Sequence, residues 1–116
     1  MNEFILHAAP LASWSAAQET GAYTADSLAS QGFVHCSSPE QILRVANALY
    51  KGRRDLVLLA IDPARLTSEL RWEPGVDLAS ELFPHVYGPI NLQAVIRVVV
   101  FEPDANGIFT RLPNIG

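Results

Sequence analysis

Residues 32–38, GFVHCSS, bring four side chains capable of chemistry into one short stretch. Two apolar residues begin what the pattern predicts as a buried strand, and His35, Cys36, Ser37 and Ser38 then follow with no further apolar residue. An imidazole exchanges protons near neutral pH, an ionised thiol is a nucleophile, and a hydroxyl hydrogen-bonds a ligand. The stretch therefore indicates either a functional site or the start of a helix.

The residues after this stretch favour a helix start. Ser38 is typical of an N-cap, Pro39 of the first helical position, and Gln41 completes a capping box. Ser38 then needs no catalytic role. Free backbone N–H groups at a helix start attract a phosphate or carboxylate, and His35 and Ser37 would flank such a ligand. Both are candidate ligand-binding residues, with a purely structural histidine as the alternative for His35.

Other candidates lie at the ends of predicted strands. His7 ends the first strand, and His85 and Tyr87 lie in FPHVYGPI, where two prolines and a glycine restrict the backbone. These three residues are candidate ligand-binding residues or, alternatively, core residues. Strand alternation places Cys36 on the same side as Val34, which predicts a buried, inert thiol.

The charged candidates have two interpretations each. Glu73, between a tryptophan and a proline, is either a site carboxylate or a solvated residue at a strand end. Arg53 and Arg54 follow the main helix and are weak candidates for phosphate binding, although the helix dipole also explains them.

Phosphate-loop, dinucleotide-fingerprint and nucleophile-elbow motifs are missing, and no histidine pair has metal-ligand spacing. We therefore expect no metal, and a metal-dependent hydrolase would require the three histidines and Glu73 to converge in space.

Composition limits the classes of function. The chain has 116 residues, 49% of them hydrophobic, which fits one α+β domain over residues 1–116. With 17% charged residues and a net charge of −4, nucleic acid and anionic membranes are not expected partners. The single cysteine excludes an internal disulfide. No secretory signal and no apolar run of membrane-spanning length is visible, so we expect a cytoplasmic protein.

The elements that must position these residues follow from periodicity and turn signals. Strands are predicted at residues 3–8, 33–36, 55–62, 70–73, 84–87 and 94–103. Helices are predicted from Pro10 to a stop at Gly21, over residues 24–32 with a stop at Gly32, and after Ser38. Asn106-Gly107 predicts a type I′ turn that returns residues 108–111 as a hairpin arm. Helices mainly in the first half and strands later indicate an α+β fold with a mixed or largely antiparallel sheet.

The motifs, taken together, resemble a known family. FILHAA, GFVHCSS, DLVLLAIDPARL, LRWEP and FPHVYGPINLQAV occur in an order similar to that of domain-of-unknown-function family 952, DUF952, and cover nearly the whole chain. This resemblance implies small bacterial proteins without an established activity.

A more distant resemblance suggests a chemistry. A histidine on the first strand, His7, and an H-x-S motif at His35 and Ser37 are similar to the NAD-binding elements of the ADP-ribosyltransferase superfamily. The RNA 2′-phosphotransferase branch, which uses NAD to remove a phosphate from spliced tRNA, is closest in motif style. The resemblance implies that His7 holds a ribose hydroxyl, that His35 and Ser37 line a nicotinamide pocket, and that Glu73 binds the nicotinamide ribose. A carboxylate there would stabilise the oxocarbenium charge that develops when the ribose–nicotinamide bond breaks.

Three hypotheses follow. The first is a transferase or NAD-cleaving enzyme of ADP-ribosyltransferase-like architecture, with Glu73 and His35 as its catalytic residues and NAD as its cofactor. Arginine-modifying members of that superfamily carry two glutamates separated by one residue, where this chain has Arg71-Trp72-Glu73. The second hypothesis is therefore a non-catalytic module that binds a small molecule or anion. The third is the metal-dependent hydrolase.

Overall fold

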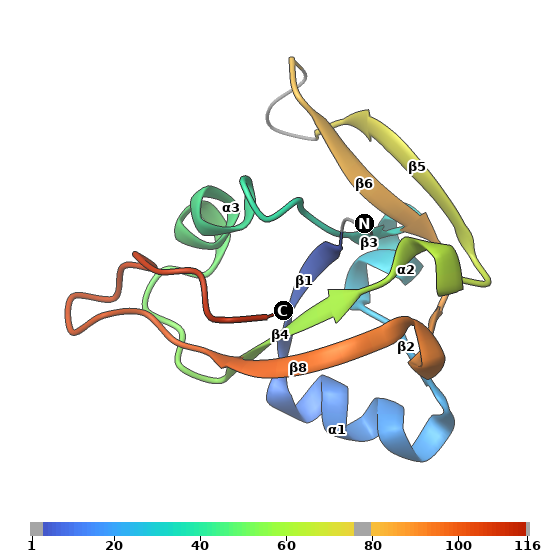
Figure 1. Ribbon diagram of the computed structural model, residues 1–116, viewed down its shortest axis with the longest axis horizontal. Helices are drawn as coiled ribbons and strands as arrows, with labels where there is room; N and C mark the ends of the chain where they lie inside the picture. The colour runs from blue at the N-terminus through green and yellow to red at the C-terminus, as the bar shows by residue number, and fades with distance from the viewer. Residues whose placement is uncertain (1–3, 76–79, 116) are drawn as a thin grey trace.

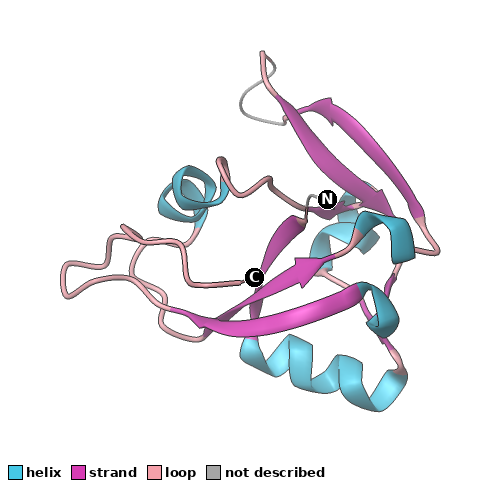
Figure 2. Cartoon of the chain, viewed as in Figure 1, coloured by secondary structure: helices cyan, strands magenta, loops and turns pink. Residues whose placement is uncertain are grey.

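The computed structural model describes residues 4–75 and 80–115 (Figure 1). They contain eight strands and three α-helices. The helices alternate with the strands β1 to β4 in the first half of the chain, and strands dominate the second half (Figure 2). The strands are β1 (Ile5–Pro10), β2 (Ala22–Tyr23), β3 (Val34–His35), β4 (Leu56–Ile61), β5 (Glu69–Pro74), β6 (Leu82–Tyr87), β7 (Ile90–Asn91) and β8 (Val95–Phe101). The helices are α1 (Leu11–Thr20), α2 (Asp26–Gln31) and α3 (Ile42–Leu49), with short 3-10 turns at Pro63–Arg65 and Leu92–Ala94.

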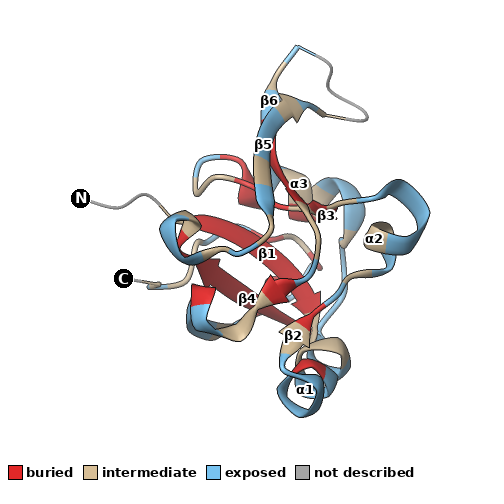
Figure 3. Cartoon of the chain, turned by 90° about the vertical axis from the view of Figure 1, so that its right-hand side faces the viewer, coloured by how far each residue is buried: buried red, intermediate tan, exposed pale blue. Residues whose placement is uncertain are grey.

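The first sheet has the strand order β1-β4-β8 and forms the centre of the molecule. Every residue of β4 is buried, as its nearly continuous apolar sequence predicted (Figure 3). Leu59 and Ile61 pack into one core cluster, and Leu58 and Ala60 pack into a second cluster on the opposite face. Burial of each leucine or isoleucine contributes about 1.5–3 kcal/mol, so the two faces of this strand anchor the fold.

The second sheet has the strand order β3-β6-β5. Val34 pairs with Val86, and His35 pairs with His85. A single bridge joins the two sheets: the Leu6 N–H donates to the Ser37 carbonyl at 2.7 Å, and the Ser37 N–H donates to the Leu6 carbonyl at 2.8 Å. Within the described residues, β1 therefore pairs with the second sheet by its main chain at this bridge alone.

All strand pairs within the described residues are antiparallel, including the small pair β2–β7. The α+β class and the antiparallel pairing are therefore confirmed. The helices alternate with β1, β2 and β3 rather than preceding the strands, so the predicted division into a helical first half and a strand-rich second half is only approximate. None of the described helices has the length and apolar character needed to cross a membrane.

The predicted helix stops are confirmed, but the predicted start of the main helix is not. Gly21 and Gly32 end α1 and α2 with φ angles of 92° and 89°, which glycine adopts without steric cost. α3 begins at Ile42, and no side chain caps it directly. Half of the capping box is present, because the Gln41 side-chain oxygen accepts a hydrogen bond from the Ser38 N–H at 2.9 Å. Residues 39–41 form a turn before the helix instead of its first turn.

The predicted hairpin at Asn106-Gly107 is wrong. A type I′ turn needs a positive φ at both central residues, and no described non-glycine residue has one. Instead, the Asp104 carboxylate accepts hydrogen bonds from the N–H groups of Asn106 and Ile108 and organises a local turn. Residues 108–111 form no strand; Phe109 is held by the Asn47 amide, which donates to its carbonyl and accepts from its N–H.

Candidate functional site

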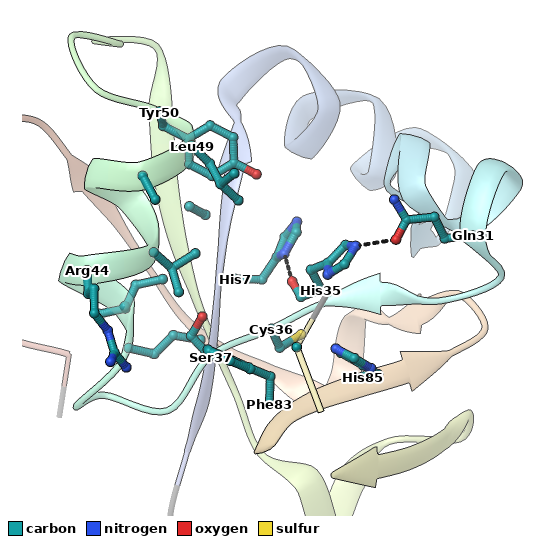
Figure 4. A pocket seen from close by; sticks show the side chains of 16 residues that line it. His7, Gln31, His35, Cys36, Ser37, Arg44, Leu49, Tyr50, Phe83 and His85 are labelled. Atoms are coloured by element: carbon teal, nitrogen blue, oxygen red, sulfur yellow. Dashed lines mark hydrogen bonds between the residues drawn. The ribbon is translucent and has the colours of Figure 1, made fainter. Parts of the chain in front are cut away.

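A cavity of about 290 Å³ lies between α3 and the point where the two sheets join (Figure 4). One wall comes from α3 and includes Arg44, Leu49 and Tyr50. The opposite wall comes from residues 6–8 of β1, residues 35–37 at the end of β3, and β6. The predicted candidates His7, His35, Ser37 and His85 all line this cavity, whereas Glu73, Tyr87, Arg53 and Arg54 are not among its described lining residues.

Pro84 explains why the strands open here. The Cys36 N–H donates to the Pro84 carbonyl at 3.0 Å, but Pro84 has no N–H to return the bond. The β3–β6 ladder therefore ends after the His35–His85 pair, although Pro84 lies within a central strand. Ser37, whose backbone N–H and carbonyl point to the other edge of β3, bonds to Leu6 of β1, and the cavity lies beside this junction.

His35 and His85 face each other across the ladder. Their ring centroids are 5.5 Å apart, with the rings nearly perpendicular. Because Val34 and Val86 point into the core, strand alternation turns both histidines to the opposite face of the sheet. Phe33 lies on the same face and stacks on His85 at 4.1 Å between centroids. The two imidazoles are thus held beside each other on an aromatic support.

Gln31 fixes the orientation of His35. The His35 Nε2–H donates to the Gln31 side-chain oxygen at 2.7 Å, because that oxygen can only accept. In the neutral ring, Nδ1 therefore carries the lone pair. Gln31 is the last residue of α2, so the end of that helix positions the imidazole.

His7 is buried, and both of its ring nitrogens have partners. Nδ1–H donates to the His35 carbonyl at 2.6 Å, which leaves Nε2 to accept from the Tyr23 hydroxyl at 2.8 Å. Burial lowers the pKa of His7 to about 4, although the bond to the His35 carbonyl acts in the opposite direction. Burial also raises the pKa of Tyr23, which keeps its hydroxyl protonated. A neutral His7 therefore fastens β1 to β3 and β2.

Glu73 reaches the cavity wall only through His85. One oxygen of its carboxylate accepts from the Tyr87 hydroxyl at 2.5 Å and from His85 Nδ1–H at 2.9 Å. These two hydrogen bonds, the Tyr87 bond first, hold the pKa of Glu73 below its usual range, and the same bond raises the pKa of Tyr87. The Arg71 guanidinium lies over the Tyr87 ring at 4.4 Å from its centroid. The ionised carboxylate fixes the His85 tautomer and leaves the lone pair of the neutral ring on Nε2.

The remaining sequence candidates are placed as follows. Cys36 lines the cavity as a buried free thiol, and burial raises its pKa, as expected for an inert residue. Ser37 is buried, and its main chain makes the bridge to β1. Arg53 forms an ion pair with Asp55 and lies over the ring of the lining residue Tyr50, and Arg54 donates to two main-chain carbonyls; neither arginine lines the cavity.

Tyr23, Gln31 and Arg44 were not predicted from the sequence as site residues. Arg44 projects from α3 and lines the cavity, a position that depends on how the helix packs over the join of the sheets. Among the described residues, no group of three or more His, Cys, Asp or Glu side chains is placed to hold a metal ion. The arrangement therefore gives the metal-dependent hydrolase no support within the described part of the chain.

Fold and site together define a small α+β domain of antiparallel sheets with a histidine-lined cavity. The chain belongs to the family described as protein of unknown function (DUF952), whose model matches residues 8–98. It is similar to protein CC0527 from Caulobacter crescentus, with 30% sequence identity; the crystal structure covers 92% of this chain and 93% of that chain at a TM-score of 0.83. A solution NMR structure of CC0527 gives a TM-score of 0.79 over 92% of this chain and 91% of that chain. No curated protein matches the sequence.

Proposed function

We propose that the cavity binds NAD or a related nucleotide and that the protein is an ADP-ribosyltransferase-like transferase or NAD-cleaving enzyme. The observation that carries the proposal is the pair of His35 and His85 on the cavity wall, 5.5 Å apart, with Glu73 hydrogen-bonded to His85 from behind. Such a pair of imidazoles, one of them supported by an ionised carboxylate, is suited to binding polar groups and to transferring protons.

The size and lining of the cavity support a nucleoside-sized group. Its volume of about 290 Å³ is at the lower end of known ligand pockets, so it fits the nicotinamide–ribose part of NAD rather than the whole dinucleotide. The half-buried Tyr50 and the exposed Leu49 offer apolar surface at the mouth. His35 and Ser37 offer polar groups on the opposite wall. This combination matches a flat heteroaromatic ring joined to a sugar.

His7 has an indirect role in this proposal. Both of its ring nitrogens are engaged by the protein, so a ribose hydroxyl would have to displace the Tyr23 hydroxyl. We therefore assign His7 to positioning: it holds the main chain of His35 and so fixes that side of the cavity.

Glu73 and His85 act as a unit in the proposed reaction. The nicotinamide leaves with the electrons of its bond to the ribose, and a water or acceptor hydroxyl adds to the same carbon. His85, with a lone pair on Nε2, accepts the proton of that hydroxyl, and Glu73 stabilises the resulting imidazolium. Tyr87 holds the Glu73 carboxylate in place. Glu73 is thus a positioning residue that does not touch the ligand.

Binding is tested by thermal unfolding with NAD, ADP-ribose and AMP. A ligand at about one hundred times its dissociation constant adds about 2.7 kcal/mol, which raises the melting temperature by roughly 10 °C for a chain of this size. His35→Ala should abolish that rise and leave the melting temperature of the free protein nearly unchanged. If none of the ligands raises the melting temperature of the wild type, the nucleotide proposal fails.

Catalysis is tested by measuring nicotinamide release from NAD over hours. Glu73→Gln should lower the rate at least tenfold, since the amide neither carries the charge nor accepts as strongly from His85. Glu69→Gln is the matched control, because Glu69 lies on the same strand and pairs with Arg71 instead. NAD binding without release that depends on Glu73 would identify a non-catalytic binding module.

A further inference from the structure

The formal charge on the described part of the cavity lining is positive. Arg44 is the only Lys, Arg, Asp or Glu among the described lining residues, although the whole chain has a net charge of −4. We propose that Arg44 forms a phosphate subsite at the mouth of the cavity, which holds the phosphate of a nucleotide whose nucleoside end lies inside. This inference rests on the proposed nucleotide function and adds the group that selects nucleotides over nucleosides.

The side chain of Arg44 is placed to make such a contact. It projects from α3, on the wall of the cavity opposite His35 (Figure 4), and it is 54% exposed. Among the described residues it bonds to Glu81, whose Oε2 accepts from Nη2 at 2.6 Å. A guanidinium has five N–H donors in one plane, so most of its hydrogen-bonding capacity is open to a phosphate.

Glu81 holds Arg44 in the way that a phosphate would. Its Oε2 also accepts from the Gln41 amide at 2.8 Å, and the same amide donates to the Leu82 carbonyl at 2.8 Å. Gln41 thus anchors Glu81 whether or not Arg44 bonds to it. An exposed ion pair is weak, and the pyrophosphate of NAD or ADP-ribose carries two negative charges where a carboxylate carries one, so an arriving pyrophosphate can take Arg44 from Glu81.

The two arginines expected from sequence are poorly placed for this role. Arg53 donates twice to Asp55, at 2.6 and 3.0 Å. Arg54 donates to the main-chain carbonyls of Pro103 and Asp104. Neither lines the cavity; Arg53 lies over the ring of Tyr50 at 5.8 Å from its centroid, but its guanidinium is occupied by Asp55.

The test compares ligands that differ in phosphate, measured by calorimetry on wild type and Arg44→Gln. Adenosine, nicotinamide riboside, AMP, ADP-ribose, NAD and inorganic phosphate are the probes. Wild type should bind NAD and ADP-ribose more tightly than either nucleoside, and Arg44→Gln should weaken their binding about 10- to 100-fold while nucleoside binding stays the same. Arg65→Gln, which removes an exposed arginine paired with Asp62, is the matched control and should change neither.

A second variant should change the binding of NAD and ADP-ribose in the opposite direction. Glu81→Gln removes the competing charge, so it should strengthen the binding of NAD and ADP-ribose, whereas a merely structural ion pair predicts weaker or unchanged binding. Two outcomes would refute the phosphate subsite and leave the nucleoside site intact. In the first, nucleosides and NAD bind the wild type equally. In the second, the double variant Arg53→Gln/Arg54→Gln lowers phosphate-dependent binding and Arg44→Gln does not. Absence of binding for every nucleotide and nucleoside refutes the proposed function and the subsite together.

Discussion

Acidification should destabilise the fold through His7. Burial lowers the pKa of His7 from 6.5 to about 4. Between these two values the unfolded chain takes up a proton that the folded chain excludes, so the free energy of unfolding falls as the pH falls. Above the unfolded pKa of 6.5, His7 is neutral in both states and its contribution is fully present.

The size of the loss follows from the two pKa values. Each pH unit between them removes at most about 1.4 kcal/mol. Lowering the pH from about 7.5 to about 4.5 should therefore remove about 2.5 kcal/mol from the free energy of unfolding through His7 alone. Urea unfolding of wild type and His7→Gln at both pH values isolates this amount, because every other titrating group is present in both proteins. The stability advantage of the wild type should shrink by that amount.

A constant difference between the two proteins, within about 0.5 kcal/mol over this pH range, would refute the buried neutral imidazole. Should His7→Gln fail to fold, NMR of the wild type gives the same answer, since the chain has three histidines and their ring nitrogens can be assigned. His7 should keep a protonated Nδ1 and an unprotonated Nε2 down to a pH of about 4. A midpoint near 6.5 would contradict the structure.

Three further predictions concern single side chains. Cys36 should resist alkylation in the native protein and react upon unfolding, because burial raises its pKa and blocks access. Gln41→Ala should lower the free energy of unfolding by about 2 kcal/mol, since this buried amide bonds the Ser38 N–H and the Leu82 carbonyl. Asn47→Ala should cost about 2 kcal/mol and speed hydrogen exchange around Phe109, whose N–H and carbonyl both lose a partner.

Each of these predictions has an outcome that would contradict it, and two of them have a matched control. Fast alkylation of native Cys36 at neutral pH would mean that the thiol is accessible. Gln93→Ala, at an exposed position, should leave the stability within about 0.5 kcal/mol of the wild type, and an equal effect at both glutamines would contradict the role of Gln41. Asn106→Ala is the corresponding exposed control for Asn47. Unchanged exchange in Asn47→Ala would show that other contacts hold the segment.

Local patterns predicted those elements that depend on local causes. The run at residues 55–62 predicted β4 because a strand buried on both faces needs apolar residues throughout. Gly21 and Gly32 predicted two helix ends because a left-handed residue is needed there. The type I′ turn was wrong because the Asp104 carboxylate, two residues earlier, supplies a different turn. The helix start was wrong because Gln41 also bonds the distant Leu82 carbonyl and Glu81.

The candidate site was predicted in part. Alternation along β3 predicted a buried Cys36, and the strand-end positions of the histidines made them candidate ligand-binding residues; His7, His35 and His85 all line the one cavity. The partners were not predictable, because Tyr23 and Gln31 meet the histidines only through the packing of β2 and α2. Because the position of Arg44 on the cavity wall also depends on packing, no local sequence pattern distinguishes it from Arg53 and Arg54, which lie next to each other in the sequence.

The position of the cavity depends on a feature that can be seen in the sequence but interpreted only in the structure. Proline inside a central strand normally weakens a sheet, because it cannot donate to the ladder. Here Pro84 accepts from Cys36 and returns no bond, so the β3–β6 ladder ends at this point. The backbone groups of His35 and Ser37 point to the other edge of β3, where the His35 carbonyl accepts from the side chain of His7 and Ser37 pairs with Leu6 of the first sheet. The second sheet is thus interrupted at Pro84 and joined to the first at Ser37, one residue beyond Cys36, and the histidine cavity lies at this junction.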